Sequence, residues 1–415
     1  MVRYGYFITR YGYSPYVFAC LTKVPFRASE VASETTRYNL VIPSLEEKKA
    51  YGGVRTAIAF LLELAGRGFD ARIVVQEKVS EAALRKFPEW TPMESARDGL
   101  KARIISSTHS SDGGPGTLAV RANDIFVTTT WLTHFLMSDV LEFQRRTFAA
   151  PHPIVYFIQD FEPGFFEWSS QYMLAESTYH TPGTIAVFNS TELFSYFKRL
   201  GYSFSYEAVF SPRLNQEMAR WETAHRGKRT VRKNQIVFYG RPARPRNCFP
   251  LIIEAINLFI QRYPDVAKDW EFVSIGSSLG SFTLKDGRRL RSRGKMSLTD
   301  YAQLLSETKV GISLMCSPHP SYPPLEMAAF GVVTITNQFV DKDLRGFSPN
   351  IVSLETLTFE TLCEAIYEAT RRADRGSGDE TPAMASFHRG EGQFSAVIDS
   401  IVGIVGGEAG GQTRP

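Results

Sequence analysis

The chain has 415 residues, a length typical of two or three domains, and its 43% of apolar residues exclude a disordered protein. Its 47 basic and 43 acidic residues leave a net charge of +4, which is too small to indicate a nucleic-acid-binding protein. No apolar run reaches the roughly 20 residues that cross a bilayer, and the N-terminus lacks the apolar core of a signal peptide. A globular, cytoplasmic protein is therefore expected.

Apolar segments of strand length alternate with helical patterns through the first half of the chain. Strands are predicted at 37–43, 71–76, 102–106, 124–129, 153–159, 184–188 and 207–210, and helices at 54–66, 131–143 and 192–200. Because the strands are almost continuously apolar and helices separate many of them, we predict a parallel sheet that is covered on both faces.

A second alternating series follows a polar, basic linker at 211–234, for which one short helix is predicted. Its strands are predicted at 235–239, 271–275, 309–315 and 332–336, and its helices at 248–262, 298–307, 325–330 and 393–405. The predicted fold class is therefore α/β, with two Rossmann-like, doubly wound domains facing a central cleft. Their bounds are an N-terminal domain at 1–215, a C-terminal domain at 216–385, a helix at 386–405 that could pack back on the N-terminal domain, and a disordered tail at 406–415.

Ligands of such sheets collect beyond the carboxyl ends of the strands, and two loops of this kind carry candidate residues in the first half. Gly53 opens a helix after the first strand, where glycine serves either a tight turn or the approach of an anion to backbone N–H groups. Asp160 and Glu162 follow a strongly apolar strand, where carboxylates need solvent or a partner. We predict a catalytic role for this pair, with Asp160 directed into the cleft. The alternative for Asp160 is a cap on the next helix.

The corresponding loops of the second half are basic. Arg241 follows Tyr239 at a strand end, and Arg246 comes shortly after; an arginine held in this way suits a phosphate group. Gly276 opens a glycine-rich loop that could cradle phosphate, and Lys295, just before a predicted helix, could reach a diphosphate.

Glu326 lies in the predicted first turn of the helix at 325–330. Its carboxylate could accept hydrogen bonds from two adjacent hydroxyls, such as those of ribose, or it could simply complement the helix dipole. The basic residues at 226–233 are interpreted as a solvated face or a patch for anionic lipid headgroups.

Cysteine spacing and acidic clusters give no sign of a metal site. The four cysteines stand far apart, which predicts reduced and mostly buried thiols: Cys20, Cys248, Cys316 and Cys363. No His, Cys and Asp cluster has convincing metal spacing, so neither a metal nor a cofactor is expected.

Several segments carry a family resemblance, and they span about residues 37–375. The most informative are AYGGVRTAIAFLLELAGRGFDARIVV (50–75), VYFIQDFEPGFFEWSSQYMLAESTYH (155–180), FYGRPARPRNCFPLIIEAI (238–256), GKMSLTDYAQLLSETKVGISLM (294–315) and SPHPSYPPLEMAAFGVVTITN (317–337). These segments are similar to glycosyltransferase family 4, which implies the two-domain GT-B fold, retention of anomeric configuration and no need for a metal. The QDFEP and PSYPPLEMA segments resemble rhamnosyltransferases that build bacterial surface glycans from dTDP-L-rhamnose.

The resemblance implies roles for individual residues and for the partners. Arg241 and Lys295 would bind the donor diphosphate, and Glu326 would bind the nucleoside sugar, with the backbone from Leu325 to Met327 facing the phosphates. Gly53 would border donor and acceptor, and Asp160 would contact the transferred sugar or the acceptor hydroxyl. The implied partners are a nucleotide-sugar donor, dTDP-L-rhamnose, and a glycan acceptor, with a lipid-linked glycan and peripheral membrane contact among the alternatives; nucleic acid is not expected.

Two departures from the family pattern bear on these roles. Pro318 occupies the position of a second glutamate, and the lysine that usually follows the Gly-Arg pair is absent, so that Arg244 or Arg246 would replace it. The leading expectation is a retaining rhamnosyltransferase of surface glycan assembly. The alternatives are a UDP- or GDP-sugar transferase, an epimerase, and a non-catalytic glycan-binding scaffold on the same fold.

The segment Asp341-Lys342-Asp343 spells the D-x-D sequence with which single-domain glycosyltransferases hold a metal. Here it trails a polar stretch instead of ending an apolar strand, so we predict an ordinary loop.

Overall fold

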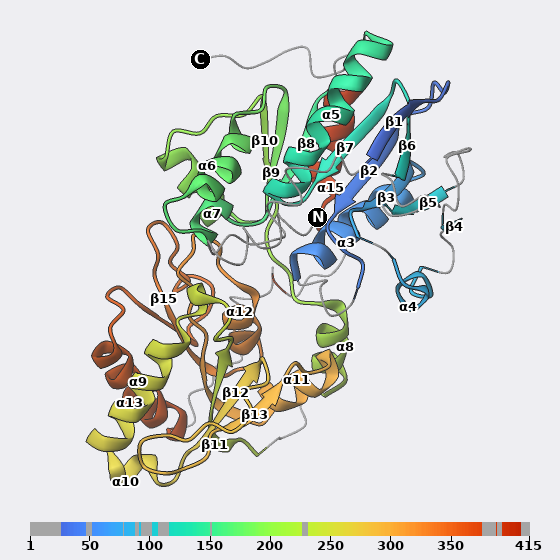
Figure 1. Cartoon of the computed structure of the whole chain (residues 1–415). Coiled ribbons are helices and arrows are strands. Elements are labelled where there is room, and N and C mark those ends of the chain that lie inside the picture. The colour runs from blue at the N-terminus through green and yellow to red at the C-terminus, as the bar shows by residue number, and fades with distance from the viewer. Residues whose placement is uncertain are drawn as a thin grey trace, which may run out of the picture. The chain divides into compact units, whose positions relative to one another are not determined.

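The structure, a computed structural model, describes residues 26–46, 52–77, 79–87, 91–92, 102–106, 116–149, 152–225, 231–375, 387 and 392–407. Its contacts divide the chain into two compact units (Figure 1). The N-terminal unit comprises Met1–Asn189, Gly201–Phe210 and Phe394–Pro415, and the C-terminal unit comprises Ser190–Leu200 and Ser211–Gln393. Most of the predicted tail and Cys20 lie outside the described residues.

In its described part, the N-terminal unit contains an eight-stranded parallel sheet. The strands run in the order β10 (Tyr206–Val209), β9 (Thr184–Phe188), β8 (Ile154–Ile158), β7 (Asp124–Thr128), β2 (Arg37–Ile42), β3 (Asp70–Val75), β5 (Ala102–Ser106) and β4 (Thr91–Pro92). A smaller parallel pair joins β1 (Phe26–Glu30) to β6 (Gly116–Val120). The central strands are buried on both faces, which explains their continuous apolar sequence.

Helices and the small strand pair cover the two faces of this sheet. One face packs on α3 (Gly52–Gly66) and on α15 (Ser395–Val405), the C-terminal helix, whose Phe394 contacts Phe60 of α3 edge-to-face at 5.6 Å. The other face packs on α5 (Trp131–Phe148) and on the β1–β6 pair. The shorter helices are α4 (Glu81–Leu84), η1 (Glu162–Phe165), α6 (Ser170–Ser177) and η2 (Thr178–His180).

A buried ionic cluster lies beneath the β1–β6 pair. Asp124 accepts two hydrogen bonds from the guanidinium of Arg37, both at 2.8 Å, and a third at 2.9 Å from the backbone N–H of Arg121. Arg72 lies 3.8 Å from the same carboxylate. All four of these side chains are fully buried, and Arg121 reaches outward to Asp70 at 2.7 Å.

The C-terminal unit contains a six-stranded parallel sheet in the order 3-2-1-4-5-6 of a dinucleotide-binding fold. Its strands are, in that order, β13 (Arg291–Gly294), β12 (Glu271–Gly276), β11 (Lys233–Gly240), β14 (Thr308–Ile312), β15 (Val333–Asn337) and β16 (Ile351–Leu354). The strand order reverses between β11 and β14, so the loops after these two strands flank the switch point where ligands bind in such sheets.

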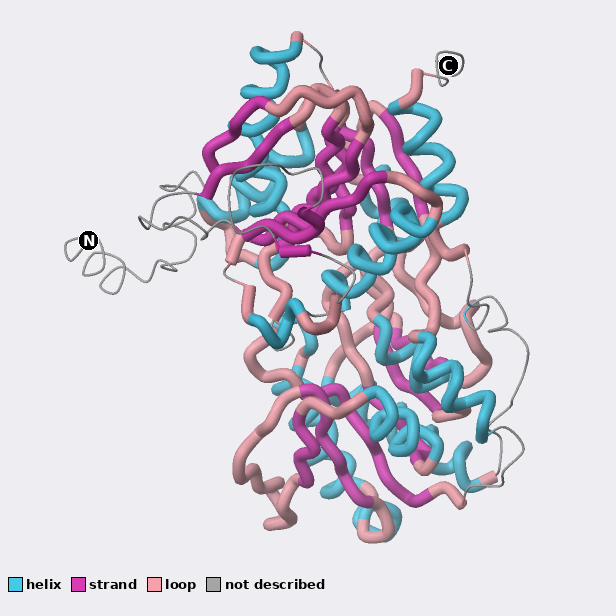
Figure 2. Tube along the Cα trace, turned by 90° about the vertical axis from the view of Figure 1, so that its right-hand side faces the viewer, coloured by secondary structure: helices cyan, strands magenta, loops and turns pink. Residues whose placement is uncertain are grey.

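Helices also cover this second sheet on both faces, as Figures 1 and 2 show. One face packs on α9 (Phe249–Arg262), α10 (Pro264–Ala267) and α13 (Phe359–Asp374), and the other packs on α8 (Gln216–His225), α11 (Leu298–Ser306) and α12 (Tyr322–Ala329). The unit also includes α7 (Thr191–Arg199) and η3 (Pro245–Asn247).

The structure confirms the predicted alternation of strands and helices, with every predicted strand present within a few residues of its predicted bounds. It adds elements that were not predicted, among them β1, β4, β6, β16, α4, α6, α10 and α13. Two helix bounds were wrong: α5 ends at Phe148, five residues after the predicted end, and α12 begins at Tyr322, three residues before the predicted start, because prolines are accommodated in the first turn of a helix. Among the described residues, no helix combines the length and the apolar character needed to cross a membrane.

Candidate functional site

Three neighbouring strands of the C-terminal sheet end in glycine at the same edge. β11, β12 and β13 end at Gly240, Gly276 and Gly294, and they pair in parallel. Arg241 and Lys295, which follow β11 and β13, therefore lie with the Gly276 loop at one edge of the sheet. The structure thus brings together three of the residues that the sequence singled out.

Arg241 is positioned by an aromatic neighbour and by a glycine. Its guanidinium lies 5.9 Å from the centre of the Tyr239 ring and 3.4 Å from the Tyr239 hydroxyl. Gly276, at a φ of 98°, faces both residues: a Cβ there would lie 3.0 Å from the Tyr239 ring and 3.1 Å from Cγ of Arg241. Only glycine both adopts this positive φ without strain and lacks a Cβ that would clash. Gly276 therefore leaves room for the Arg241 side chain beside the end of β12.

Glu326 lies on α12 beside two tyrosines. Burial raises the pKa of Glu326 to about 7, although the nearby Tyr301 hydroxyl lowers this pKa to a smaller extent. Burial, together with the nearby charges of Glu326 and Tyr239, raises the pKa of Tyr301 well above its usual range. The buried Tyr301 hydroxyl faces the carboxyl without reaching full hydrogen-bond geometry, and it has no partner among the described residues. Arg241 thus lies against Tyr239, and Tyr301 lies near both Tyr239 and Glu326, so the polar groups of these four residues are close together.

The start of α12 offers an anion fewer backbone donors than the sequence indicated. The N–H of its cap residue, Ser321, donates to His319 Nδ1 at 2.9 Å, and the next positions include two prolines, which have no N–H. Because α12 begins at Tyr322, Glu326 lies beyond its first turn, contrary to the prediction. Leu325 and Met327 are fully buried in the core, so any contact of theirs with a donor would come from the backbone.

The raised pKa of Glu326 predicts a stability that depends on pH. The folded state keeps this proton between the ordinary pKa of 4.5 and about 7, whereas the unfolded state has lost it. Stability should therefore fall as pH rises through this window, by about 2–3 kcal/mol after allowance for partial exposure. Urea unfolding of wild type and Glu326→Gln at about pH 5 and about pH 8 tests this. The variant should gain about 2–3 kcal/mol relative to wild type between the two pH values. An unchanged difference would show that the group is not desolvated.

A second group of candidate residues meets in the N-terminal unit, where the first turn of α3 approaches the carboxyl end of β8. A Cβ on Gly53 would lie 2.3 Å from Oε1 of Gln159, the residue just before Asp160. A Cβ on the neighbouring Gly52, by contrast, would have no other group within 4 Å. Gly53 therefore packs closely against the end of the Gln159 side chain, in the segment that carries Asp160.

The Asp160–Glu162 loop is held by hydrogen bonds on several sides. The Tyr179 hydroxyl donates to the carbonyl of Asp160 at 3.4 Å and accepts from the N–H of Glu162 at 3.1 Å. The Asp160 carboxylate accepts the N–H of Phe161 at 2.9 Å. The Glu162 carboxylate accepts the N–H of Trp131, the first residue of α5, where the helix dipole favours a negative charge. The two carboxylates thus have different surroundings.

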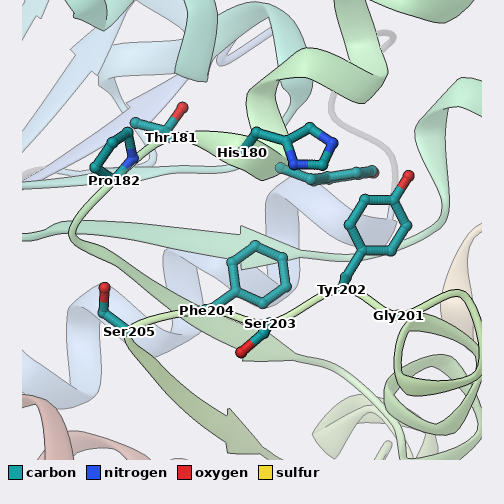
Figure 3. Close-up of a pocket in the computed structure, with 9 residues that line it drawn as sticks. His180, Thr181, Pro182, Gly201, Tyr202, Ser203, Phe204 and Ser205 are labelled. Carbon is teal, nitrogen blue, oxygen red and sulfur yellow. The ribbon is translucent and has the colours of Figure 1, made fainter.

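A cavity of about 320 Å³ lies beside the β9 strand of the N-terminal unit (Figure 3), and Tyr179 is one of the residues that line it. The rings of Tyr202 and Phe204 and the hydroxyls of Ser203 and Ser205 line it. Aromatic faces combined with hydroxyl groups suit a carbohydrate, and Tyr179 connects this cavity to the Asp160 loop.

The D-x-D segment forms a loop, as predicted, and its carboxylates are engaged by arginines. Arg199 binds Asp341 through Nη2 at 2.6 Å, and Arg345 binds Asp343 at 2.6 Å. Lys342 between them is fully buried, and its ammonium donates to the Met315 carbonyl at 2.5 Å. Throughout the part of the chain that the structure describes, no cluster of His, Cys, Asp and Glu could hold a metal ion.

The basic linker is only partly a solvated face. Arg232 donates to the carbonyls of Thr308 and Phe330 at 2.6 and 2.5 Å, and so ties the ends of two elements together. Arg232 is therefore not an open surface cation, while a lipid-binding patch at 226–233 stays a prediction. Residues 226–230 lie outside the described residues.

Comparison with known protein families identifies the family of this chain. Residues 37–191 match the N-terminal domain of WsaF, and residues 234–367 match its C-terminal domain, together more than half of the chain. The chain belongs to the WsaF family. Its two matched regions are glycosyltransferase domains, and they contain Gly53 and Asp160 in the first and Arg241, Lys295 and Glu326 in the second.

A curated relative shares part of its sequence with this WsaF-family chain. It is 30% identical over 184 residues to the O-antigen biosynthesis protein RfbC of Myxococcus xanthus. The match covers 44% of this chain and 14% of RfbC, so it reflects a shared region of a much longer protein.

Solved structures of glycosyltransferases share the fold. Sucrose-phosphate synthase of Thermosynechococcus elongatus superposes with a TM-score of 0.57 at 11% identity, covering 90% of this chain and 99% of the synthase. HepE of Anabaena, solved with UDP-glucose, gives a TM-score of 0.56 at 11% identity, covering 89% of this chain and 99% of HepE. WaaG, a glycosyltransferase involved in lipopolysaccharide biosynthesis, gives 0.53 at 11% identity, covering 90% and 100%. At these identities the likeness shows the fold, which is α/β GT-B as predicted.

Proposed function

We propose that this chain transfers a sugar from a nucleoside-diphosphate sugar to a hydroxyl of a growing surface glycan. The observation that carries the proposal is the group formed by Arg241, Tyr239, Tyr301 and Glu326, with Lys295, at the carboxyl edge of a 3-2-1-4-5-6 sheet. It combines fixed positive charge for a diphosphate with a carboxyl and a phenol for sugar hydroxyls. That the acceptor-side residues face this group across a cleft stays a prediction.

The donor we favour is dTDP-L-rhamnose, and the support for it is the resemblance of the QDFEP and PSYPPLEMA segments. A UDP-sugar is the second candidate, because Glu326 is suited to two adjacent ribose hydroxyls, of which deoxyribose has only one. HepE, which shares the fold, was solved with UDP-glucose. Competition between dTDP and UDP therefore separates the candidates.

The proposed mechanism relies on stabilising the leaving group. Breaking the bond between sugar and phosphate builds negative charge on the diphosphate, and Arg241 and Lys295 would stabilise that charge more in the transition state than in the ground state. The leaving phosphate would take the acceptor proton on the face it leaves, which gives retention. Asp160 as base or nucleophile is the competing role, while Glu162, bound to the start of α5, would position the loop.

The acceptor would bind to the N-terminal unit, where Asp160 lies beyond the end of β8. The cavity that Tyr179 helps to line supports a glycan in this place, and the similarity to RfbC supports a surface glycan.

Incubation of the purified chain with dTDP-rhamnose, UDP-glucose and GDP-mannose, with and without rhamnoside acceptors, tests the proposal. Acceptor-dependent release of nucleoside diphosphate is expected, fastest from dTDP-rhamnose. Faster release from a UDP-sugar would replace the donor. If every donor stayed intact in the presence of acceptors while the nucleotides still bound, a non-catalytic scaffold would be favoured instead.

Close packing at Gly53 gives a matched pair of variants. In Gly53→Ala the new methyl group must push aside the end of the flexible Gln159 side chain, next to Asp160, so transfer should fall by at most about tenfold. Gly52→Ala, one residue earlier on the same helix, should keep full activity, because nothing lies within 4 Å of its new methyl group. Initial rates of donor consumption measure both. Equal activity of the two variants would refute the role given to Gly53.

A further inference from the structure

Two cysteines that stand 68 residues apart in the sequence meet in the C-terminal unit. The sulfur atoms of Cys248 and Cys316 lie 3.0 Å apart. Cys248 is half-buried and precedes α9, whereas Cys316 is exposed and follows β14; Cys363, by contrast, is buried in the core. The prediction of mostly buried thiols is therefore wrong for Cys316, whereas the three cysteines that the structure describes are free, as predicted.

The pair joins two loops that the fold places at the switch point of the sheet. Cys316 donates its N–H to the carbonyl of Arg246 at 2.8 Å, and the Asn247 side chain donates to the carbonyl of Leu314 at 3.3 Å. These contacts hold the turn after β11 against the segment after β14. A disulfide has a bond length of about 2.05 Å, so an approach of only about 1 Å would allow the bond to form.

We propose that Cys248 and Cys316 are a redox site that reacts reversibly with small-molecule disulfides, and that the resulting bond regulates the donor site; the second part rests on the proposed function. In the first step the Cys316 thiolate attacks one sulfur of the small disulfide, and one thiolate of that molecule leaves. In the second step Cys248 loses its proton and attacks the sulfur of Cys316, which releases the second thiolate. The two protein thiols are oxidised to one disulfide, the small disulfide is reduced to two thiols, and the two thiol protons pass to them.

The surroundings of the two thiols determine which of them reacts first with the small disulfide. The hydrogen bond from Cys248 and the positive charge of Lys342 lower the pKa of Cys316 to about 7. The same contact with Cys316, together with burial, raises the pKa of Cys248. The exposed Cys316 is therefore the attacking thiol, and the more buried Cys248 completes the bond.

Oxidation would act on the turn that carries the basic residues. Arg244 and Arg246 lie between Arg241 and Cys248, and a disulfide would restrict any movement of this turn toward a diphosphate. The oxidised protein should therefore bind nucleotide about fivefold more weakly, at the low end of common couplings between sites.

The first experiment uses the full chain with Cys20→Ser and Cys363→Ser, so that only the pair remains. The reduced protein is treated with glutathione disulfide, alkylated and weighed by mass spectrometry. Both thiols should become protected together, without retained glutathione, and dithiothreitol should restore them. Adding Cys248→Ser should leave a stable glutathione adduct on Cys316, whereas adding Cys316→Ser should leave Cys248 nearly unmodified. Full alkylation after treatment, or retained glutathione on the two-cysteine protein, would overturn the redox site.

The second experiment titrates UDP and dTDP into the reduced and the oxidised forms by calorimetry. The expected result is a weaker affinity in the oxidised form, and equal affinities would overturn the regulatory part. If the reduced form bound neither nucleotide, the proposed function would fail, while the result from mass spectrometry would decide the redox site independently.

Discussion

Asp124→Asn should destabilise the N-terminal unit by about 3–5 kcal/mol, the range found when one partner of a buried ionic cluster is removed. Burial by itself would raise the pKa of Asp124, but hydrogen bonds from Arg37 and the charges of Arg72 and Arg37 hold it below its usual range. Without this charge the buried guanidiniums lose their main counter-ion. The electrostatic cost of burial is already evident at Arg72, because burial lowers the pKa of its guanidinium to about 9.

Urea unfolding at neutral pH measures this loss, with Asp139→Asn as the matched control. Asp139 lies exposed on α5 of the same unit, so its replacement should change the unfolding midpoint little. Because the pKa of Asp124 is depressed in the folded state, its contribution should also vanish in wild type as pH falls below about 4. Equal midpoints for the two variants at neutral pH would contradict the account of the cluster.

Asp160→Asn decides between the two proposed proton acceptors: a fall in the rate of sugar transfer of about 10²–10⁴-fold would assign the base to Asp160, whereas the proposed mechanism, with the leaving phosphate as base, predicts a loss of less than about tenfold. The new side chain keeps an oxygen for the N–H of Phe161, which Asp160 accepts at 2.9 Å, so the loop should hold its shape. Nucleotide affinity should not change, because the proposed nucleotide site lies in the other unit.

Transfer assays with saturating donor, together with calorimetry of the same variant, separate these effects. Glu167→Gln, an exposed carboxylate a few residues along the chain, is the control and should retain full activity. If Asp160→Asn lost less than about tenfold in rate, Asp160 would only help to bind the acceptor, and the leaving phosphate would be the base.

The sheet edges were predictable from the sequence, and with them part of the site. Each apolar strand ends at a recognisable polar or glycine-containing loop, so Arg241, Gly276 and Lys295 could be placed at one edge before any coordinates were known. Asp160 was placed in the same way at the end of β8. Parallel sheets make this possible because their strands all end on the same side.

The contacts between distant segments were not predictable. Tyr301 is one of several residues on an amphipathic helix, and nothing in its own segment indicates that its hydroxyl faces Glu326. The approach of Cys248 to Cys316 depends on how two loops after neighbouring strands pack together, and the spacing of the cysteines in the sequence does not predict it. Glu162 was predicted to act beside Asp160, yet the residue that its carboxylate meets, Trp131, is set by the packing of α5.

Calorimetric titration of dTDP and UDP into wild type and Arg241→Ala tests the central claim most directly. The account predicts that wild type binds at least one of these nucleotides, and that the variant binds it more than tenfold more weakly because a fixed partner of the diphosphate is lost. Equal affinities would contradict the claim that the edge of the C-terminal sheet at Arg241 holds the diphosphate of the donor.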